Sequence, residues 1–220
     1  MMTLSRIAEE KKIEQLLQAF PHLQKQIPNL QFMIVGDGPD LESLEALSHD
    51  LGIEDDVTFV GAVDHNKIAP YYQLADLFVS SSDTETQGLT YIEAMAAGLK
   101  CVLRSSDYTD TIFDNPDIGT TFRSLTEMQL QIINYFHHPH AFTDPKPRQT
   151  KLKMISADHF GDAVLAFYQD AQDNFDLTQL QRQRVNDELD QPSNAKRAKE
   201  HARLRERNRQ RLDELKEKLI

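Results

Sequence analysis

The sequence LFVSSSDTETQGLTYIEAMAAG, residues 77–98, decides the fold because it holds a strand, a loop and a helix in direct succession. Leu77-Phe78-Val79 is a short apolar run, too short for a helix and typical of a strand that is buried on both faces. Tyr91 to Ala97 has a strongly helical composition and ends at Gly98, a residue that favours a helix C-terminus. The stretch therefore predicts a buried strand that leads through the polar loop 80–88 into the start of a helix.

Similar segments flank this stretch on both sides. Further short apolar runs predict strands at Thr3-Leu4, Phe32–Val35, Val57–Val60 and Cys101–Leu103. Apolar residues at helical spacing predict helices over 13–27, closed by Pro28, and over 41–51, closed by Gly52. Strands that alternate with helices at this spacing indicate βαβ units. The predicted fold class is therefore α/β, a Rossmann-like parallel sheet with flanking helices.

The pattern changes after residue 123. Two more amphipathic helices are expected over 125–136 and 160–175, and the segment 137–149, rich in Pro and His, is interpreted as a loop. Residues 177–220 lose apolar content, gain Lys and Arg, and are expected to form a charged, mostly helical C-terminal tail. We therefore predict two parts, a domain over 1–176 and the tail over 177–220.

Composition excludes several functional classes. The chain has 220 residues, a net charge of −11 and one cysteine, so we expect neither nucleic-acid binding nor a disulfide framework. No apolar run approaches the length needed to span a bilayer, and no signal-peptide pattern is visible. We expect a cytoplasmic protein, with peripheral contact at the inner face of the cell membrane as an option that the basic tail leaves open.

The loop after Val79 holds the candidate binding residues. Ligands of open α/β sheets bind beyond the carboxyl ends of the strands, and a helix N-terminus offers free N–H groups to a phosphate. Gly88 has no side chain, so a ligand can approach the backbone there, and Glu85 and Glu93 stand on either side of it. A carboxylate can accept hydrogen bonds from two neighbouring sugar hydroxyls. The alternative is that both glutamates only stabilise the helix N-terminus through its dipole.

This region carries a resemblance to a known family. Glu85-x7-Glu93, with Gly88-Leu89 inside it and Glu93-Ala94-Met95-Ala96-x-Gly98 at its end, is similar to the donor-site motif of glycosyltransferase family 4, which has the GT-B fold. Other segments resemble that family in the same order: Ser5-Arg6 with Glu10-Lys11, Ile34 to Pro39, and Val57 to Gly61. The match covers roughly residues 3–123, which implies the donor-binding half of a GT-B enzyme.

The resemblance implies specific roles. Glu85, Arg6 and Lys11 are expected to be catalytic: Glu85 places the hexose, while Arg6 and Lys11 offset charge on the leaving diphosphate. Without the resemblance, Arg6 and Lys11 are better explained as surface charges beside a helix start. The implied donor-binding set is Gly36, Gly38, Gly61, Gln87, Gly88, Leu89, Thr90 and Glu93. In it, backbone amides near Gly88 hold the distal phosphate and Glu93 accepts from the ribose hydroxyls.

Details of the motif point to one branch of the family. Many members have an aromatic residue where Gln87 stands, and the segment with Asp107-Tyr108-Thr109-Asp110 and Gly119-Thr120-Thr121-Phe122 resembles the 1,2-diacylglycerol 3-alpha-glucosyltransferases of Gram-positive bacteria. The resemblance thus implies a retaining enzyme that uses UDP-glucose and needs no cofactor and no metal. His137, His138 and His140 have no Cys or acidic partner nearby and are interpreted as loop residues rather than metal ligands.

A GT-B enzyme also has an N-terminal acceptor domain, and the chain begins almost at the first strand of the second domain. We therefore expect this chain alone to have little or no transferase activity. Its expected partners are a nucleotide-sugar and that N-terminal acceptor domain. Two alternatives stay open: a family 4 enzyme that acts on a polysaccharide or a protein-linked glycan, and a non-catalytic partner subunit.

Overall fold

A computed structural model describes residues 1–85, 88–190, 199, 202–203 and 206–207 of the chain. The chain divides into two compact units, Met1–Ser156 and Ala157–Ile220. The division lies before the predicted boundary at residue 176. The reason is that the last amphipathic helix, expected to end the first domain, belongs to the second unit and continues well beyond Phe175.

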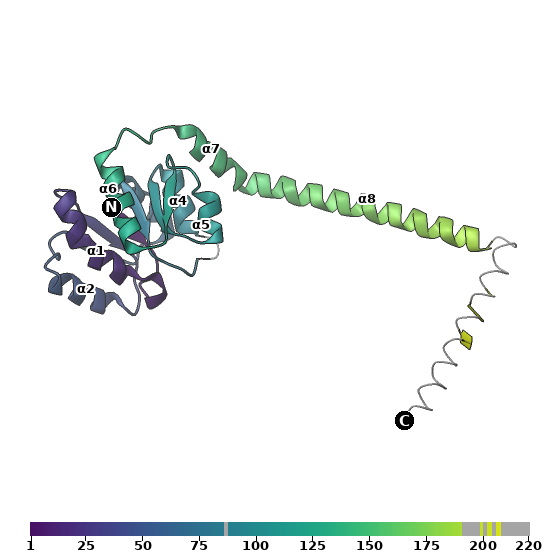
Figure 1. The fold of residues 1–220 in the computed structure, drawn as a ribbon, viewed down its shortest axis with the longest axis horizontal. Helices are drawn as coiled ribbons and strands as arrows, with labels where there is room; N and C mark the ends of the chain where they lie inside the picture. Colours follow the sequence, from purple (N-terminus) through teal and green to yellow (C-terminus); the bar gives the residue numbers. More distant parts are fainter. Residues whose placement is uncertain (86–87, 191–198, 200–201, 204–205, 208–220) are drawn as a thin grey trace, which may run out of the picture. The chain divides into compact units, whose positions relative to one another are not determined.

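The first unit is built on a parallel sheet (Figure 1). Its strands in the described residues are β1 Met2–Leu4, β2 Phe32–Val35, β3 Val57–Gly61, β4 Leu77–Ser80, β5 Lys100–Arg104 and β6 Gly119–Phe122. All neighbours are parallel, and the strand order is β3-β2-β1-β4-β5-β6. This is the order of a doubly wound Rossmann-like sheet. The predicted fold class is confirmed.

Helices connect the strands and cover both faces of the sheet. In the described residues of the first unit they are η1 Glu9–Lys11, α1 Ile13–Gln26, α2 Leu41–Asp50, η2 His65–Lys67, α3 Ala69–Leu74, α4 Leu89–Ala97, α5 Asp107–Ile112, α6 Leu125–His137 and α7 Pro145–Met154. Parallel strands need such crossovers because each chain segment must return to the same edge before the next strand begins.

The strands are buried on both faces, as their continuous apolar runs predicted. Along β4, Val79 lies in one hydrophobic cluster with Phe20 of α1, while Phe78 lies in a second cluster with Tyr91 of α4. Neighbouring residues of a strand point to opposite faces, so one short run supplies both clusters. The two clusters fix α1 and α4 against the sheet, and these are the helices that follow β1 and β4.

The segment 137–149 was predicted to be a loop, and this prediction is wrong for its second half. Helix α7 starts at Pro145, whose fixed φ suits a first helical turn. The Asp144 side chain caps this helix by accepting a hydrogen bond of 3.0 Å from the Lys146 N–H. A cap and an N-terminal proline therefore outweigh the loop-like composition.

The described part of the second unit is mainly helix α8, Ala157–Asp190. Large apolar side chains on it are exposed, among them Phe160, Phe167, Tyr168 and Phe175. None of the helices in the described residues is long and apolar enough to cross a membrane.

Candidate functional site

The strand order creates a crevice between β1 and β4. From β1 the chain winds outward to β2 and β3, and from β4 it winds the other way to β5 and β6. The loops that follow β1 and β4 therefore separate at the carboxyl edge of the sheet, where open α/β sheets bind ligands. The loop after β1 carries Arg6, and the loop after β4 leads through Glu85 to α4.

A cavity of about 320 Å³ lies at this edge. It is bordered by Leu4 and Ser5 at the end of β1. Its other lining residues are all predicted site residues: Arg6, Lys11, Glu85, Gly88, Leu89 and Thr90. The fold thus brings together both predicted cations, the first predicted carboxylate and the start of α4.

Opposite charges meet inside this cavity. Lys11 Nζ lies 2.5 Å from Glu85 Oε1, and only about a fifth of either side chain is exposed (17% and 20%). The Arg6 guanidinium is exposed and forms no hydrogen bond or ion pair with the described residues. Arg6 is therefore free to bind an anion, whereas Lys11 must exchange its present partner to do so.

A second set of contacts holds the loop after β4 in place. The buried Ser81 hydroxyl donates a hydrogen bond of 2.6 Å to the Lys12 carbonyl, and Lys12 forms an ion pair with Asp83. These contacts tie the loop to the junction between η1 and α1. They were not predicted, because Ser81 and Lys12 lie far apart in the sequence.

Gly88 caps the N-terminus of α4 without a side chain that could satisfy the free N–H groups of the first turn. Its φ of 53° is left-handed, and an added Cβ would lie 2.7 Å from Tyr91 Cδ2 and 2.9 Å from Tyr108 Cε1. Glycine is thus required here by both backbone and space. Because Gly88, Leu89 and Thr90 line the cavity, the backbone donors of this turn and the positive end of the helix dipole are available to an anion there.

Two tyrosines support this turn. The Tyr91 hydroxyl shares a hydrogen bond of 2.9 Å with Ser80 at the end of β4, and burial raises the pKa of Tyr91. Burial also raises the pKa of Tyr108, and the negative charge of Glu85 adds to that rise. Both hydroxyls therefore stay protonated at neutral pH, and that of Tyr91 is already engaged with Ser80.

Glu93 is not among the residues that line the cavity. It lies one turn further along α4 and faces α3, where its Oε2 accepts a hydrogen bond of 2.8 Å from the Tyr72 hydroxyl. Its Oε1 lies 3.7 Å from His65 Nδ1. The two predicted carboxylates therefore occupy different parts of the carboxyl edge, as the two ends of an extended ligand would require.

The predicted glycines of the β2 and β3 loops have structural surroundings. A Cβ on Gly36 would lie 1.8 Å from the Ser5 carbonyl oxygen, and one on Gly38 would lie 2.0 Å from that of Ile7. Both glycines thus let the β2 loop pack directly against the backbone on either side of Arg6. Gly61 accepts a hydrogen bond of 2.9 Å from the Gly36 N–H and has open space where a Cβ would stand. Their contact with a donor stays a prediction.

Gln87 lies outside the described residues, so its predicted role stays a prediction. The described residues hold no group of three or more His, Cys, Asp or Glu side chains arranged to bind a metal ion.

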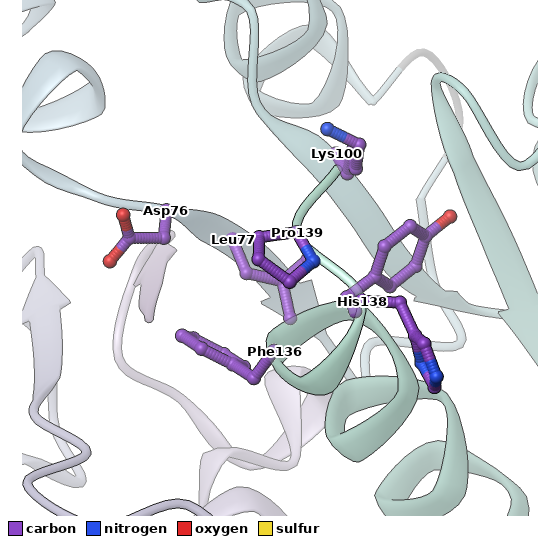
Figure 2. A pocket seen from close by; sticks show the side chains of 7 residues that line it. Asp76, Leu77, Lys100, Phe136, His138 and Pro139 are labelled. Atoms are coloured by element: carbon purple, nitrogen blue, oxygen red, sulfur yellow. The ribbon is translucent and has the colours of Figure 1, made fainter. Parts of the chain in front are cut away.

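A different cavity, of about 380 Å³, lies where strands β4 and β5 begin, at the end of the sheet opposite to the carboxyl ends of its strands (Figure 2). Asp76 and Leu77 border it at the start of β4, Lys100 at the start of β5, and Phe136 and His138 at the end of α6. None of the predicted site residues lies there.

Known proteins resemble this chain in sequence and in fold. Residues 1–130 match the family described as glycosyl transferases group 1. The chain belongs to this family. The resemblance to GT-B glycosyltransferases that the Glu85–Glu93 motif indicated is thereby confirmed.

Two curated relatives are named as synthases of a glycolipid. The chain is 38% identical over 136 residues to an alpha-monoglucosyldiacylglycerol synthase of Acholeplasma laidlawii, covering 62% of this chain and 34% of that protein. It is 32% identical over 176 residues to the enzyme of the same name in Streptococcus pneumoniae, covering 78% and 38%. The chain thus spans about a third of the length of these relatives.

Solved structures of glycosyltransferases share the fold. The pneumococcal O-GlcNAc transferase GtfA, solved in complex with UDP and GlcNAc, aligns with a TM-score of 0.64 over 79% of this chain and 35% of its own. The sequence identity is 20%, so this likeness supports the fold alone.

Proposed function

We propose that the carboxyl edge of β1 and β4 binds a nucleotide-sugar, and that the chain is the donor-binding part of a retaining, metal-independent glycosyltransferase. The observation that carries this proposal is the cavity in which Arg6, Lys11 and Glu85 converge on the start of α4. Two cations and a helix N-terminus suit a diphosphate, and a carboxylate beside them suits sugar hydroxyls. Glu93, further along α4, is the candidate for the ribose.

The donor and the acceptor are proposed from the relatives. Two proteins that are 38% and 32% identical to this chain are named alpha-monoglucosyldiacylglycerol synthases, so we assign UDP-glucose as donor and diacylglycerol as acceptor. Because the chain spans about a third of those proteins, we place acceptor binding in a further domain outside these residues. Contact with the inner face of a membrane follows from a lipid acceptor.

A change of ion-pair partner at Lys11 is the central chemical step of the proposal. In the structure its ammonium is paired with Glu85, and the Arg6 guanidinium is unpaired among the described residues. When a donor binds, Lys11 turns to the diphosphate, and the Glu85 carboxylate becomes free to accept hydrogen bonds from the hexose. Arg6 and Lys11 then stabilise the negative charge that develops on the leaving UDP, a task that a metal ion performs in other sites.

Calorimetry with the 220-residue chain tests this proposal. UDP and UDP-glucose should bind, EDTA should leave the affinity unchanged, and Lys11→Met should lower it about tenfold through the loss of one charge-assisted hydrogen bond. Lys25→Met is the matched control, because Lys25 stands near the end of α1, away from the cavity residues. Absence of UDP binding, or an equal effect of both substitutions, would count against the proposal.

A further inference from the structure

Tyr72 connects the hydrophobic core to the carboxyl edge of the sheet. It lies on α3, its side chain is 1% exposed, and its ring packs against Phe78 of β4 with 6.1 Å between ring centres. Its hydroxyl donates a hydrogen bond of 2.8 Å to Glu93 Oε2 and lies 3.3 Å from the Thr90 carbonyl oxygen. A rigid, buried ring thus delivers one donor to one particular carboxylate oxygen.

Glu93 needs such a contact to hold a fixed orientation. Its side chain is 29% exposed, and a partly solvated glutamate on a helix otherwise samples several rotamers. With Oε2 bound to Tyr72, the second oxygen, Oε1, is held on the side where His65 approaches to 3.7 Å. His65 is 80% exposed, so a ligand can displace it. One carboxylate oxygen is thus anchored by a buried donor, and the other lies beside an exposed side chain.

Tyr72 is also chemically suited to stay a donor. Burial raises the pKa of its hydroxyl, and the hydrogen bond to Glu93 and the charge of that carboxylate raise it further. Through the neutral and mildly alkaline range the hydroxyl therefore keeps its proton and the hydrogen bond persists.

We propose that Tyr72 is a positioning residue, whose hydroxyl orients the Glu93 carboxylate to accept hydrogen bonds from the ribose hydroxyls of the donor. This inference rests on the proposed function, in which Glu93 binds the ribose. It makes Tyr72 a determinant of the preference for a ribonucleotide over its 2′-deoxy analogue. Tyr72 itself touches no ligand, and it acts only through Glu93.

The test compares UDP with 2′-deoxy-UDP by calorimetry on the full 220-residue chain. The wild-type chain should bind UDP about tenfold more tightly, the value of one hydrogen bond to a charged group. Tyr72→Phe keeps the ring and removes only the hydroxyl, so UDP affinity should fall roughly three- to tenfold, while the affinity for 2′-deoxy-UDP, which keeps only the 3′-hydroxyl, should fall less. The preference for ribose is therefore the quantity that the substitution should reduce.

Tyr135→Phe is the matched control. The Tyr135 hydroxyl is also buried and donates a hydrogen bond of 2.7 Å, to the Pro116 carbonyl, but it lies on α6 beside the opposite cavity. This substitution should reduce stability and leave the ribose preference at the wild-type value. In a Glu93→Gln background, Tyr72→Phe should have no further effect on that preference, because Tyr72 acts on the ligand only through Glu93, which is already replaced.

Each outcome separates the inference from the proposed function. If Glu93→Gln lowers the ribose preference and Tyr72→Phe does not, the positioning role is wrong and the donor site stands. If Tyr72→Phe weakens both nucleotides equally, Tyr72 has only a structural role and the inference fails. If the wild-type chain binds neither nucleotide, the proposed function is overturned and the inference with it. If Tyr72→Phe does not fold, Tyr72→Leu decides, because it also lacks the hydroxyl and adds no volume to the buried site: a reduced preference supports positioning, and an unchanged one contradicts it.

Discussion

Gly88→Ala should destabilise the protein more than an ordinary glycine substitution in a left-handed turn. At a φ of 53° a non-glycine residue costs about 1–2 kcal/mol in the folded state. The added Cβ would lie 2.7 Å from Tyr91 and 2.9 Å from Tyr108, and overpacking of this kind costs a further 1–3 kcal/mol or so. The expected loss in the free energy of unfolding is therefore about 2–5 kcal/mol.

Gly52→Ala provides the matched control. Gly52 has a similar φ of 66°, but nothing lies within 4 Å of the place its Cβ would take. Gly52→Ala should lower the free energy of unfolding only by the cost of the left-handed backbone, about 1–2 kcal/mol. The entropy change of the unfolded chain is the same for both substitutions, so their difference isolates the contact with the two rings.

Urea unfolding followed by circular dichroism measures both values. UDP affinity should also fall in Gly88→Ala and stay unchanged in Gly52→Ala, since only the first substitution disturbs the start of α4. Equal losses of stability for the two variants would refute the reasoning, because they would show that the rings move aside without cost.

Further predictions concern single side chains. Arg6→Ala should change the free energy of unfolding by no more than about 0.5 kcal/mol, since the exposed guanidinium has no partner among the described residues. UDP affinity should nevertheless fall about tenfold. Equal losses of stability and of binding free energy would contradict this. Ser81→Ala should lower the free energy of unfolding in urea by about 0.5–1.5 kcal/mol, because it removes the hydrogen bond of 2.6 Å to the Lys12 carbonyl, which still accepts one from the Gln15 N–H; a loss near zero would contradict a stabilising role for this contact. Cys101 is fully buried, and burial raises the pKa of its thiol. The rate of its alkylation by iodoacetamide should therefore be set by the rate at which the fold opens. Rapid labelling of the native protein would contradict the buried position of Cys101.

The central strands could be predicted because both of their faces are buried. Residues 32–35 and 77–79 are continuously apolar. Such a run is too short for a helix and is typical of a strand that is buried on both faces. Strand β6, Gly119–Phe122, was quoted as a family segment but not predicted as a strand. Among the described residues it pairs only with β5, and it contains two threonines, so its sequence has no apolar run to recognise. Helices α3 and α5 are too short to show a periodic stripe, and they were missed for that reason.

Part of the candidate site was also accessible from the sequence. Arg6, Lys11 and Glu85 were named from a motif order, and the sheet topology explains why they meet. The partner of Glu93 was not accessible, because its contact with Tyr72 depends on the packing of α3 against α4. The close approach of Gly36 and Gly38 to the backbone of Ser5 and Ile7 was likewise not accessible from the sequence, and their contact with a donor stays a prediction.

The most direct test of the central claim is a titration of the ¹⁵N-labelled chain with UDP, followed by backbone amide NMR. The account predicts that the largest shifts occur at Arg6, in the loop after β1, and at Gly88, Leu89 and Thr90, at the start of α4. Shifts concentrated instead around Lys100 and Phe136, at the opposite edge of the sheet (Figure 2), would contradict it, as would a spectrum that UDP leaves unchanged.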